Sequence, residues 1–205
     1  MRWKDSINSM KLDVLKEIGN IGAGNAATSL STMLSKEVEI EVPQVNLVEL
    51  PDLFNYLKSP EEIVASTIVG IKGDAPGKML MNFDSASTKH LISLLTGESP
   101  EDITSMNEMQ SSVISEIGNI LCSTYVISLS NFTSLFLETE VPILVVDMFA
   151  AIISETSMMA ATDYDDVLMI ETTLKIRNGK DLNGFLTMFP QPGSLEKIFQ
   201  KLGMS

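Results

Sequence analysis

The chain of 205 residues contains one cysteine and one histidine, and both scarcities limit its chemistry. A lone Cys122 excludes an internal disulfide and any zinc site built from several cysteines. A lone His90 excludes a histidine-based catalytic triad and a metal site that needs several imidazoles of the chain. Cys122 lies within an expected helix and has no identifiable base beside it, so we expect it to pack rather than to act as a nucleophile.

Basic residues are scarce as well, since 14 Lys and Arg stand against 27 Asp and Glu and leave a formal net charge of −13. A chain this acidic is repelled by phosphate backbones and anionic lipids, which makes nucleic acid and membrane surfaces poor partners. The most apolar stretch, residues 141–153, is interrupted by Asp147 and is shorter than a bilayer requires. Residues 1–6 have no apolar core like that of a signal peptide, and we expect a cytoplasmic protein.

An internal repeat runs through the chain. The heptapeptide Leu-Lys-Glu-Ile-Gly-Asn-Ile at 15–21 returns as Ile-Ser-Glu-Ile-Gly-Asn-Ile at 114–120, which is an offset of 99 residues. The same offset relates two further matches, Ser29–Ser31 with Ser128–Ser130 and Pro43 with Pro142. Because the spacing is retained over about thirty residues, duplication is favoured over a chance match.

The repeat continues with a longer offset. The segment GKMLMNF at 77–83 resembles GFLTMFP at 184–190, and a helix-like segment follows each. The second half therefore carries about eight extra residues, which are most economically placed around Asp163–Asp166. The acidic residues there lack the glycine and terminal Glu of a calcium-binding loop, so we expect a solvated connection.

Each half is expected to contain a long helix, an extended segment, a short helix or loop, two strands and a closing helix. Segments rich in β-branched residues and bounded by Gly, Pro, Asp or Asn predict strands at Val38–Leu50, Ile63–Ile71, Lys78–Phe83, Glu138–Met148, Val167–Ile176 and Phe185–Phe189. Asp84 and Ser194 are the expected N-caps of the closing helices. We predict one α+β domain of mixed α/β character over residues 1–205, with two repeats at about 1–104 and 105–205 that share one sheet.

The long helix of each half carries a polar stripe. At 3.6 residues per turn, the stripe of the helix over 12–34 contains Asp13, Glu17, Asn20 and Gly24. In the second copy the stripe contains Ser112, Glu116, Asn119 and Ser123. The opposite faces are largely apolar, so we predict two long helices that bury one side and present a Glu/Asn pair outward.

The Glu/Asn pair at i, i+3 is the strongest functional signal. A solvated face is the ordinary explanation of such residues, but Asn is unfavourable in a helix interior and here recurs with the same Glu at the same spacing. A carboxamide donates and accepts hydrogen bonds while staying neutral, so it can hold a water molecule in line with a phosphorus atom. The pair lacks a nucleophile, a metal cage and a phosphate cradle. The sequence therefore predicts half of a site, which another protein completes.

The two motifs resemble those of the CheC/CheX/FliY phosphatases of bacterial chemotaxis. That family has Asp or Ser, then Glu, Asn and Pro at defined spacings. Both copies match at every defined position, as Asp13-x3-Glu17-x2-Asn20-x22-Pro43 and Ser112-x3-Glu116-x2-Asn119-x22-Pro142. The resemblance extends over nearly the whole chain.

The resemblance implies a phosphatase that acts on the phosphoaspartate of a CheY-like response regulator. Glu17 and Glu116 would each form a salt bridge with the active-site lysine of the regulator, whereas Asn20 and Asn119 would each orient the attacking water. The regulator would supply Mg²⁺, and the chain would bind no cofactor of its own. The two helices would lie side by side across the sheet.

The resemblance also implies a second partner, a deamidase called CheD, and we expect the chain to be a monomer. The alternative is a non-catalytic scaffold like the related middle domain of the flagellar switch protein FliM. That domain is not expected to carry the Glu/Asn motif, so two intact motifs favour the enzyme.

A glycine-rich run at Gly19, Gly22 and Gly24 invites comparison with nucleotide-binding loops. The order of the glycines is wrong for a dinucleotide fingerprint, no strand precedes them and no Gly-Lys-Ser/Thr follows. We therefore predict that Gly22 and Ala26 allow close helix packing instead.

Overall fold

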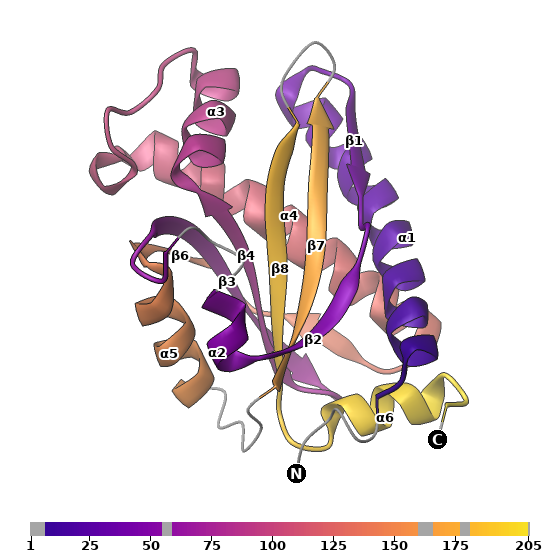
Figure 1. Cartoon of the computed structure of the whole chain (residues 1–205). Coiled ribbons are helices and arrows are strands. Elements are labelled where there is room, and N and C mark those ends of the chain that lie inside the picture. The colour runs from indigo at the N-terminus through magenta and orange to yellow at the C-terminus, as the bar shows by residue number, and fades with distance from the viewer. Residues whose placement is uncertain (1–6, 55–58, 160–165, 177–180, 205) are drawn as a thin grey trace.

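The computed structural model describes residues 7–54, 59–159, 166–176 and 181–204, and it shows a sheet of eight strands with helices on both faces (Figure 1). The strands are β1 (Val38–Glu41), β2 (Val45–Glu49), β3 (Ile63–Gly73), β4 (Gly77–Asp84), β5 (Leu137–Thr139), β6 (Ile143–Met148), β7 (Asp166–Ile176) and β8 (Leu182–Pro190). The helices are α1 (Ser9–Leu34), α2 (Leu50–Leu53), α3 (Ser85–Thr96), the 3₁₀ turn η3 (Ile103–Ser105), α4 (Glu108–Thr133), α5 (Phe149–Met159) and α6 (Ser194–Lys201).

The strands of the two halves are interleaved in the sheet. The order is β1-β7-β8-β4-β3-β5, with β2 also paired to β7 and β6 also paired to β3. The edge strands of the first half thus pair with β7 of the second half, and the edge strands of the second half pair with β3 of the first. The predicted shared sheet of a duplicated α+β fold is confirmed, whereas the division near residue 104 stays a prediction.

Side chains alternate between the two faces of the sheet, as the period of two along a strand requires. On β4, Met79 and Met81 belong to the larger core beneath α1, α3, α4 and α6, whereas Leu80 belongs to a second core beneath α2 and α5. On β7, Leu168 and Ile170 likewise face the first core. The molecule is therefore a three-layer arrangement, in which α1 and α4 lie behind the sheet in Figure 1 and α2 and α5 lie in front.

The two long helices have equivalent ends. Helix α1 is capped by Asn8, whose side chain accepts a hydrogen bond from the Lys11 N–H, and α4 is capped by Asn107 in a capping box with Gln110. At their other ends Ser35 and Ser134 take the left-handed conformation with φ of 49° and 55°. Each pair of caps is separated by the same 99 residues as the sequence repeat, from 8 to 107 and from 35 to 134.

Each predicted edge strand is broken near its proline, so the prediction of two continuous strands at 38–50 and 138–148 is wrong. Pairing of β1 with β7 ends at Glu41 opposite Thr173, and pairing of β2 resumes at Val45 opposite Ile170. Three residues of the edge strand thus lie opposite two residues of β7, as in a β-bulge. Pro43 lies in this bulge because proline has no N–H to donate to a ladder. A corresponding break separates β5 from β6 in the second half.

Two other sequence-based predictions need correction. Asp84 caps α3 as expected, but the N-cap of α6 is Gly193, and Ser194 instead donates its hydroxyl hydrogen to the Pro76 carbonyl at 2.8 Å. The extra residues of the second half are also not in one place. The offset between corresponding elements grows from 99 residues for the long helices to 103 between the starts of β3 and β7, at 63 and 166. It reaches 105 between the starts of β4 and β8, at 77 and 182, so the insertions lie at more than one point. Asp163 and Asp165 lie outside the described residues.

A buried polar network joins the two halves at the centre of the sheet. Asn82 on β4 accepts a hydrogen bond from the Ser66 hydroxyl on β3 at 2.6 Å, and it donates to the Thr187 hydroxyl and the Phe185 carbonyl on β8. All three polar side chains are buried. Because each finds a partner, the network connects strands without leaving an unsatisfied group.

In the described part of the chain, α4 is the helix with the length and apolar composition of a membrane span. Half of its most apolar window is buried inside the fold. A core helix of a soluble protein meets the same criteria, and α4 packs against α1 and the sheet.

Candidate functional site

The two motif helices lie side by side on the same face of the sheet and run in roughly opposite directions (Figure 1). Small residues allow their close approach. A methyl group on Gly22 would lie 3.0 Å from the Thr124 carbonyl oxygen, and one on Gly19 would lie 3.1 Å from the Tyr125 ring. The Tyr125 hydroxyl donates to the Leu15 carbonyl at 3.3 Å. The predicted packing through Gly22 is confirmed, and Gly19 contributes as well.

The exposure of the motif residues follows the predicted stripe. In the first copy Asp13 and Glu17 are exposed and Asn20 is half-buried. The second copy repeats this pattern, with exposed Ser112 and Glu116 and half-buried Asn119. On the opposite faces, Leu15 and Ile18 of α1 and Ile114 and Ile117 of α4 are buried. Both Glu/Asn pairs therefore lie at the surface.

The Asn20 amide is held by the bulge at Pro43. Val42 falls outside the β1–β7 ladder, and its N–H donates to Asn20 Oδ1 at 3.0 Å. A backbone N–H can only donate, so this bond identifies the oxygen of the amide and leaves Nδ2 with two donor hydrogens. The structure thus brings Asn20 to the residue before Pro43, which gives a physical reason for the spacing between Asn20 and Pro43 in the first motif.

The Asn119 amide has a different partner. Its Oδ1 accepts a hydrogen bond from the Ser123 hydroxyl, one turn further along α4, at 3.1 Å. Val141, which corresponds to Val42, is 84% exposed and precedes Pro142. The two copies therefore share the identity of the carboxamide but not the group that orients it.

The two motif glutamates are available to a partner. Glu17 and Glu116 are exposed, and within the described ranges neither forms an ion pair. Each lies one turn before its asparagine on the same helix, where side chains three residues apart are neighbours. Each motif thus presents one carboxylate and one carboxamide at adjacent positions.

Gly118, the residue before Asn119, packs directly against the sheet. A methyl group at this position would overlap the side chain of Thr67 on β3. The Thr67 hydroxyl donates to the Ile114 carbonyl at 3.3 Å, which ties the helix to the strand. In both motifs the asparagine follows a glycine that packs closely, Gly118 against Thr67 and Gly19 against Tyr125, so the repeated Gly-Asn was a sequence signal of close packing.

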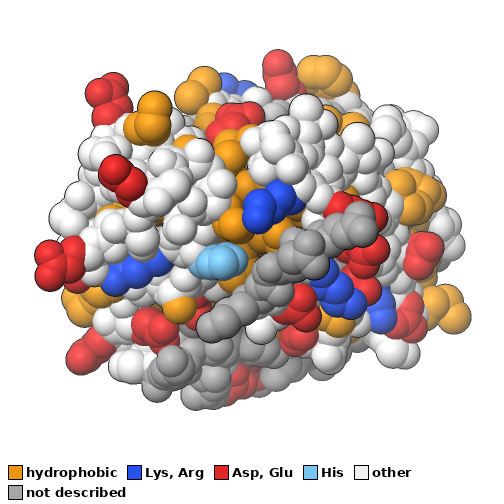
Figure 2. Space-filling model, turned by 90° about the horizontal axis from the view of Figure 1, so that it is seen from above, with side chains coloured by type: hydrophobic (Ala, Val, Ile, Leu, Met, Phe, Trp, Pro, Cys, Tyr) orange, Lys and Arg blue, Asp and Glu red, His pale blue; other side chains and the backbone are white. Residues whose placement is uncertain are grey.

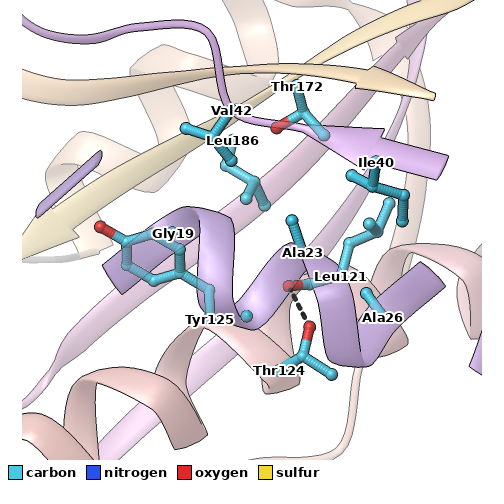
Figure 3. A pocket seen from close by; sticks show the side chains of 11 residues that line it. Gly19, Ala23, Ala26, Ile40, Val42, Leu121, Thr124, Tyr125, Thr172 and Leu186 are labelled. Carbon is cyan, nitrogen blue, oxygen red and sulfur yellow. Dashed lines mark hydrogen bonds between the residues drawn. The ribbon is translucent and has the colours of Figure 1, made fainter. Parts of the chain in front are cut away.

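A small cavity lies beneath the first motif helix (Figure 3). Its lining is largely apolar and includes Gly19, Ala23, Val42, Leu121 and Tyr125. With a volume of about 10 Å³ for water-sized spheres, it has room for about one water molecule. The cavity is therefore a packing defect rather than a substrate site.

Cys122 is buried beside the sheet, and burial raises the pKa of its thiol well above the usual range. A buried thiol that stays protonated is a poor nucleophile, so the predicted packing role is confirmed. Burial also raises the pKa of the Tyr125 hydroxyl. The residues that the structure describes contain no group of three or more His, Cys, Asp or Glu placed to hold a metal ion.

The surface is acidic but has apolar areas. Figure 2 shows acidic side chains spread over the face seen from above, with basic ones among them. In the second half, Phe136, Val141 and Ile143 are 65%, 84% and 62% exposed. The corresponding residues of the first half are exposed polar Glu37 and Gln44 and buried Val42. The second copy thus has three exposed apolar side chains that the first lacks, and this segment is called the 136–143 surface below.

Comparisons with known proteins agree with this geometry. A model of the CheC-like family matches residues 10–47 and 109–146, the segments that hold the two motifs. The CheY-P phosphatase CheC of Bacillus subtilis (strain 168) is 31% identical over 204 residues, which is 98% of this chain and 98% of that protein.

Solved structures show the same fold. Thermotoga maritima FliY superposes with a TM-score of 0.78 at 21% identity, over 96% of this chain and 98% of that one. The FliM middle domain of H. pylori superposes with a TM-score of 0.65 at 15% identity, over 95% and 99% of the two chains. At these identities the structural matches establish the architecture and not the activity.

Proposed function

This chain belongs to the CheC-like family, and we propose from this premise that it is a phosphatase for the phosphoaspartate of a CheY-like response regulator. The observation that carries the proposal is the repeated surface pair of an exposed glutamate and an oriented carboxamide, Glu17 with Asn20 and Glu116 with Asn119. The similarity to a CheY-P phosphatase over nearly the full length supports it.

The proposed task of the asparagines is to position water. With Oδ1 of Asn20 bound to the Val42 N–H, the Nδ2 group is left to donate to a water molecule in the active site of the regulator. That water attacks phosphorus in line, the bond from phosphorus to the aspartyl oxygen breaks, and the products are inorganic phosphate and the free carboxylate. Asn119 performs the same task at the second site. A carboxamide stays neutral and does not act as a base, so its proposed part is to hold the water in place and not to take a proton from it.

The proposed task of the glutamates is to anchor the regulator. Glu17 and Glu116 are exposed carboxylates one turn before their asparagines. In this proposal each pairs with the active-site lysine of the regulator while the asparagine enters its site. The regulator supplies the phosphoaspartate and Mg²⁺ in this proposal, and the ion neutralises charge on the transferring phosphoryl group. The active site is then formed jointly by two proteins.

The second candidate is a non-catalytic scaffold, because the FliM middle domain shares the fold over nearly the whole chain. The two candidates differ in what the motif residues do. A scaffold binds its partner without accelerating loss of phosphate, and replacing Asn20 or Asn119 leaves the lifetime of the phosphorylated regulator unchanged.

The experiment measures loss of phosphate from a Mg²⁺-bound, phosphorylated CheY-like regulator with wild type, Asn20→Ala, Asn119→Ala and the double variant. Losing a well-placed catalytic polar contact costs about 10²–10³ in rate, so the double variant should approach the regulator's own decay. A double variant as active as wild type contradicts the assignment. A wild-type protein that binds the regulator without accelerating its decay establishes the scaffold instead.

A second partner, a CheD-like deamidase, is also proposed, together with a cytoplasmic location and a monomeric state. The 136–143 surface is the proposed contact, because three large apolar side chains are exposed there along the sheet edge formed by β5 and β6. Ile143→Asp should weaken binding of the deamidase and leave phosphatase activity unchanged. Equal binding by wild type and Ile143→Asp would place the contact elsewhere.

A further inference from the structure

The two copies of the motif differ at the position four residues after the asparagine. The first copy has Gly24, which has no side chain and open space around it, and the second has Ser123. The Ser123 hydroxyl donates to Asn119 Oδ1 at 3.1 Å. In the first copy the Val42 N–H donates to Asn20 Oδ1. One donor therefore reaches each amide oxygen, but from a strand in one copy and from the helix itself in the other.

Ser123 forms a hydrogen bond of a different kind from several other hydroxyl side chains of the two long helices. Serine and threonine within helices commonly donate to the backbone carbonyl four residues earlier. In this chain Thr28, Thr32, Thr124 and Thr133 do so. Ser123 donates to the side chain of the residue four positions earlier instead, and that residue is the motif asparagine.

We propose that Ser123 is a positioning residue for Asn119 in the second site, replacing the backbone N–H that holds Asn20 in the first. This inference rests on the proposed function, because it assigns Ser123 a part in orienting the carboxamide that orients water. Without a donor at Oδ1, the amide of Asn119 can turn over and exchange its Nδ2 donor for its Oδ1 acceptor. With the donor in place, Nδ2 remains the group that meets the water.

The test isolates the second site in Asn20→Ala and compares that protein with Asn20→Ala/Ser123→Ala. Loss of one neutral positioning hydrogen bond should lower kcat about fivefold and leave KM for the phosphorylated regulator unchanged. Ser123→Thr in the same background keeps a hydroxyl and should retain the rate. The melting temperature should change little in either variant, since Ser123 is half-exposed.

A second comparison makes the result specific to the amide. In Asn119→Ala, which retains the first site, Ser123→Ala should add no further loss, because the side chain that it positions is gone. An equal loss in both backgrounds would show that the hydroxyl serves the fold or docking, and this would overturn the proposal.

Two other outcomes are decisive. If Asn20→Ala/Ser123→Ala is as active as Asn20→Ala, the role of Ser123 is overturned while the proposed function remains intact. A complete loss of activity in Asn20→Ala alone has the same consequence, because the second site would then have no activity for Ser123 to support. By contrast, an Asn20→Ala/Asn119→Ala protein as active as wild type overturns the phosphatase assignment itself, and the positioning role falls with it.

Discussion

Asn20 accepts a 3.0 Å hydrogen bond from the backbone N–H of Val42, a residue that lies outside the strand ladder because the chain bulges at Pro43. The bond joins the motif helix to the edge of the sheet and determines which end of the amide remains available. In the proposed function, stability therefore depends on Oδ1 of this side chain and activity on its Nδ2 group.

The first prediction separates these two roles. In the Asn119→Ala background, Asn20→Asp keeps an oxygen that can accept from Val42, but it replaces the Nδ2 donor with a charged acceptor. We expect activity to fall by about 10²-fold with little change in stability. Asn20→Ala should lose activity and also about 1 kcal/mol of unfolding free energy, because the Val42 N–H loses its partner. Rate assays and urea unfolding measure both, and equal stability of the two variants would contradict the role given to this bond.

The second prediction concerns anchoring. In the Asn20→Ala background, Glu116→Gln should raise KM for the phosphorylated regulator about fivefold with little change in kcat, because it removes a charge that holds the partner. The effect should shrink as salt is added. Glu61→Gln, an exposed carboxylate outside both motif helices, is the matched control. A fall in kcat at constant KM would assign Glu116 to the chemical step instead.

The third prediction compares two glycines on equivalent helices. Gly118→Ala places a methyl group against Thr67 on β3 and should destabilise the protein by about 1–3 kcal/mol. Gly24→Ala adds a methyl group where no atom lies within 4 Å, and it should stabilise α1 by about 0.5–1 kcal/mol. Thermal unfolding measures both. Similar melting temperatures for the two variants would mean that α4 can move away from the sheet without cost.

The fourth prediction concerns alkaline pH. Burial raises the pKa of the Cys122 thiol and the Tyr125 hydroxyl in the folded protein, whereas the unfolded chain releases these protons near pH 8.5 and 10. Above those values the unfolded state binds fewer protons than the folded state, so the unfolding free energy should fall as pH rises. Urea unfolding from pH 7 to 10.5 tests this. Cys122→Ala and Tyr125→Phe should each make the decline less steep, and an unchanged slope in both would refute it.

The fifth prediction concerns the polar network in the sheet. Asn82→Ala removes hydrogen bonds to Ser66 and Thr187 and leaves both hydroxyls buried without that partner. We expect a loss of about 2 kcal/mol or more in unfolding free energy. Ser66→Ala, which removes one bond of the network, should cost less. A larger loss from Ser66→Ala than from Asn82→Ala would show that Asn82 is not the centre of the network.

The sequence predicted what depends on periodicity and repetition. The offset of 99 residues, the two long helices and the outward Glu/Asn stripe follow from local patterns, and the structure confirms them. Residue 42 shows the limit of this approach. The N–H of Val42 is available to Asn20 because the register between β1 and β7 leaves Val42 outside the ladder. The paired residues of these two strands are more than a hundred positions apart in the chain, so no local sequence pattern indicates their register.

Two local errors have similar causes. Ser194 has the residue type of an N-cap, but the N-cap is Gly193, which takes the left-handed conformation with φ of 84°. The helix therefore begins one residue earlier than expected, at Ser194. The serine is drawn to the Pro76 carbonyl, a partner that is distant in sequence. Likewise, the difference between Gly24 and Ser123 was visible in the sequence, but its meaning depended on which atom the serine hydroxyl contacts.

The exchange of edge strands between the halves bears on the ancestry of the chain. In this chain the sheet edge beside β3 or β7 of one repeat is filled by strands of the other repeat. A single-copy ancestor could complete its sheet by associating with a second copy of itself, and gene duplication with fusion would then turn that homodimer into one polypeptide. Once fused, the two copies could mutate independently, and the different supports of Asn20 and Asn119 are a trace of that independence.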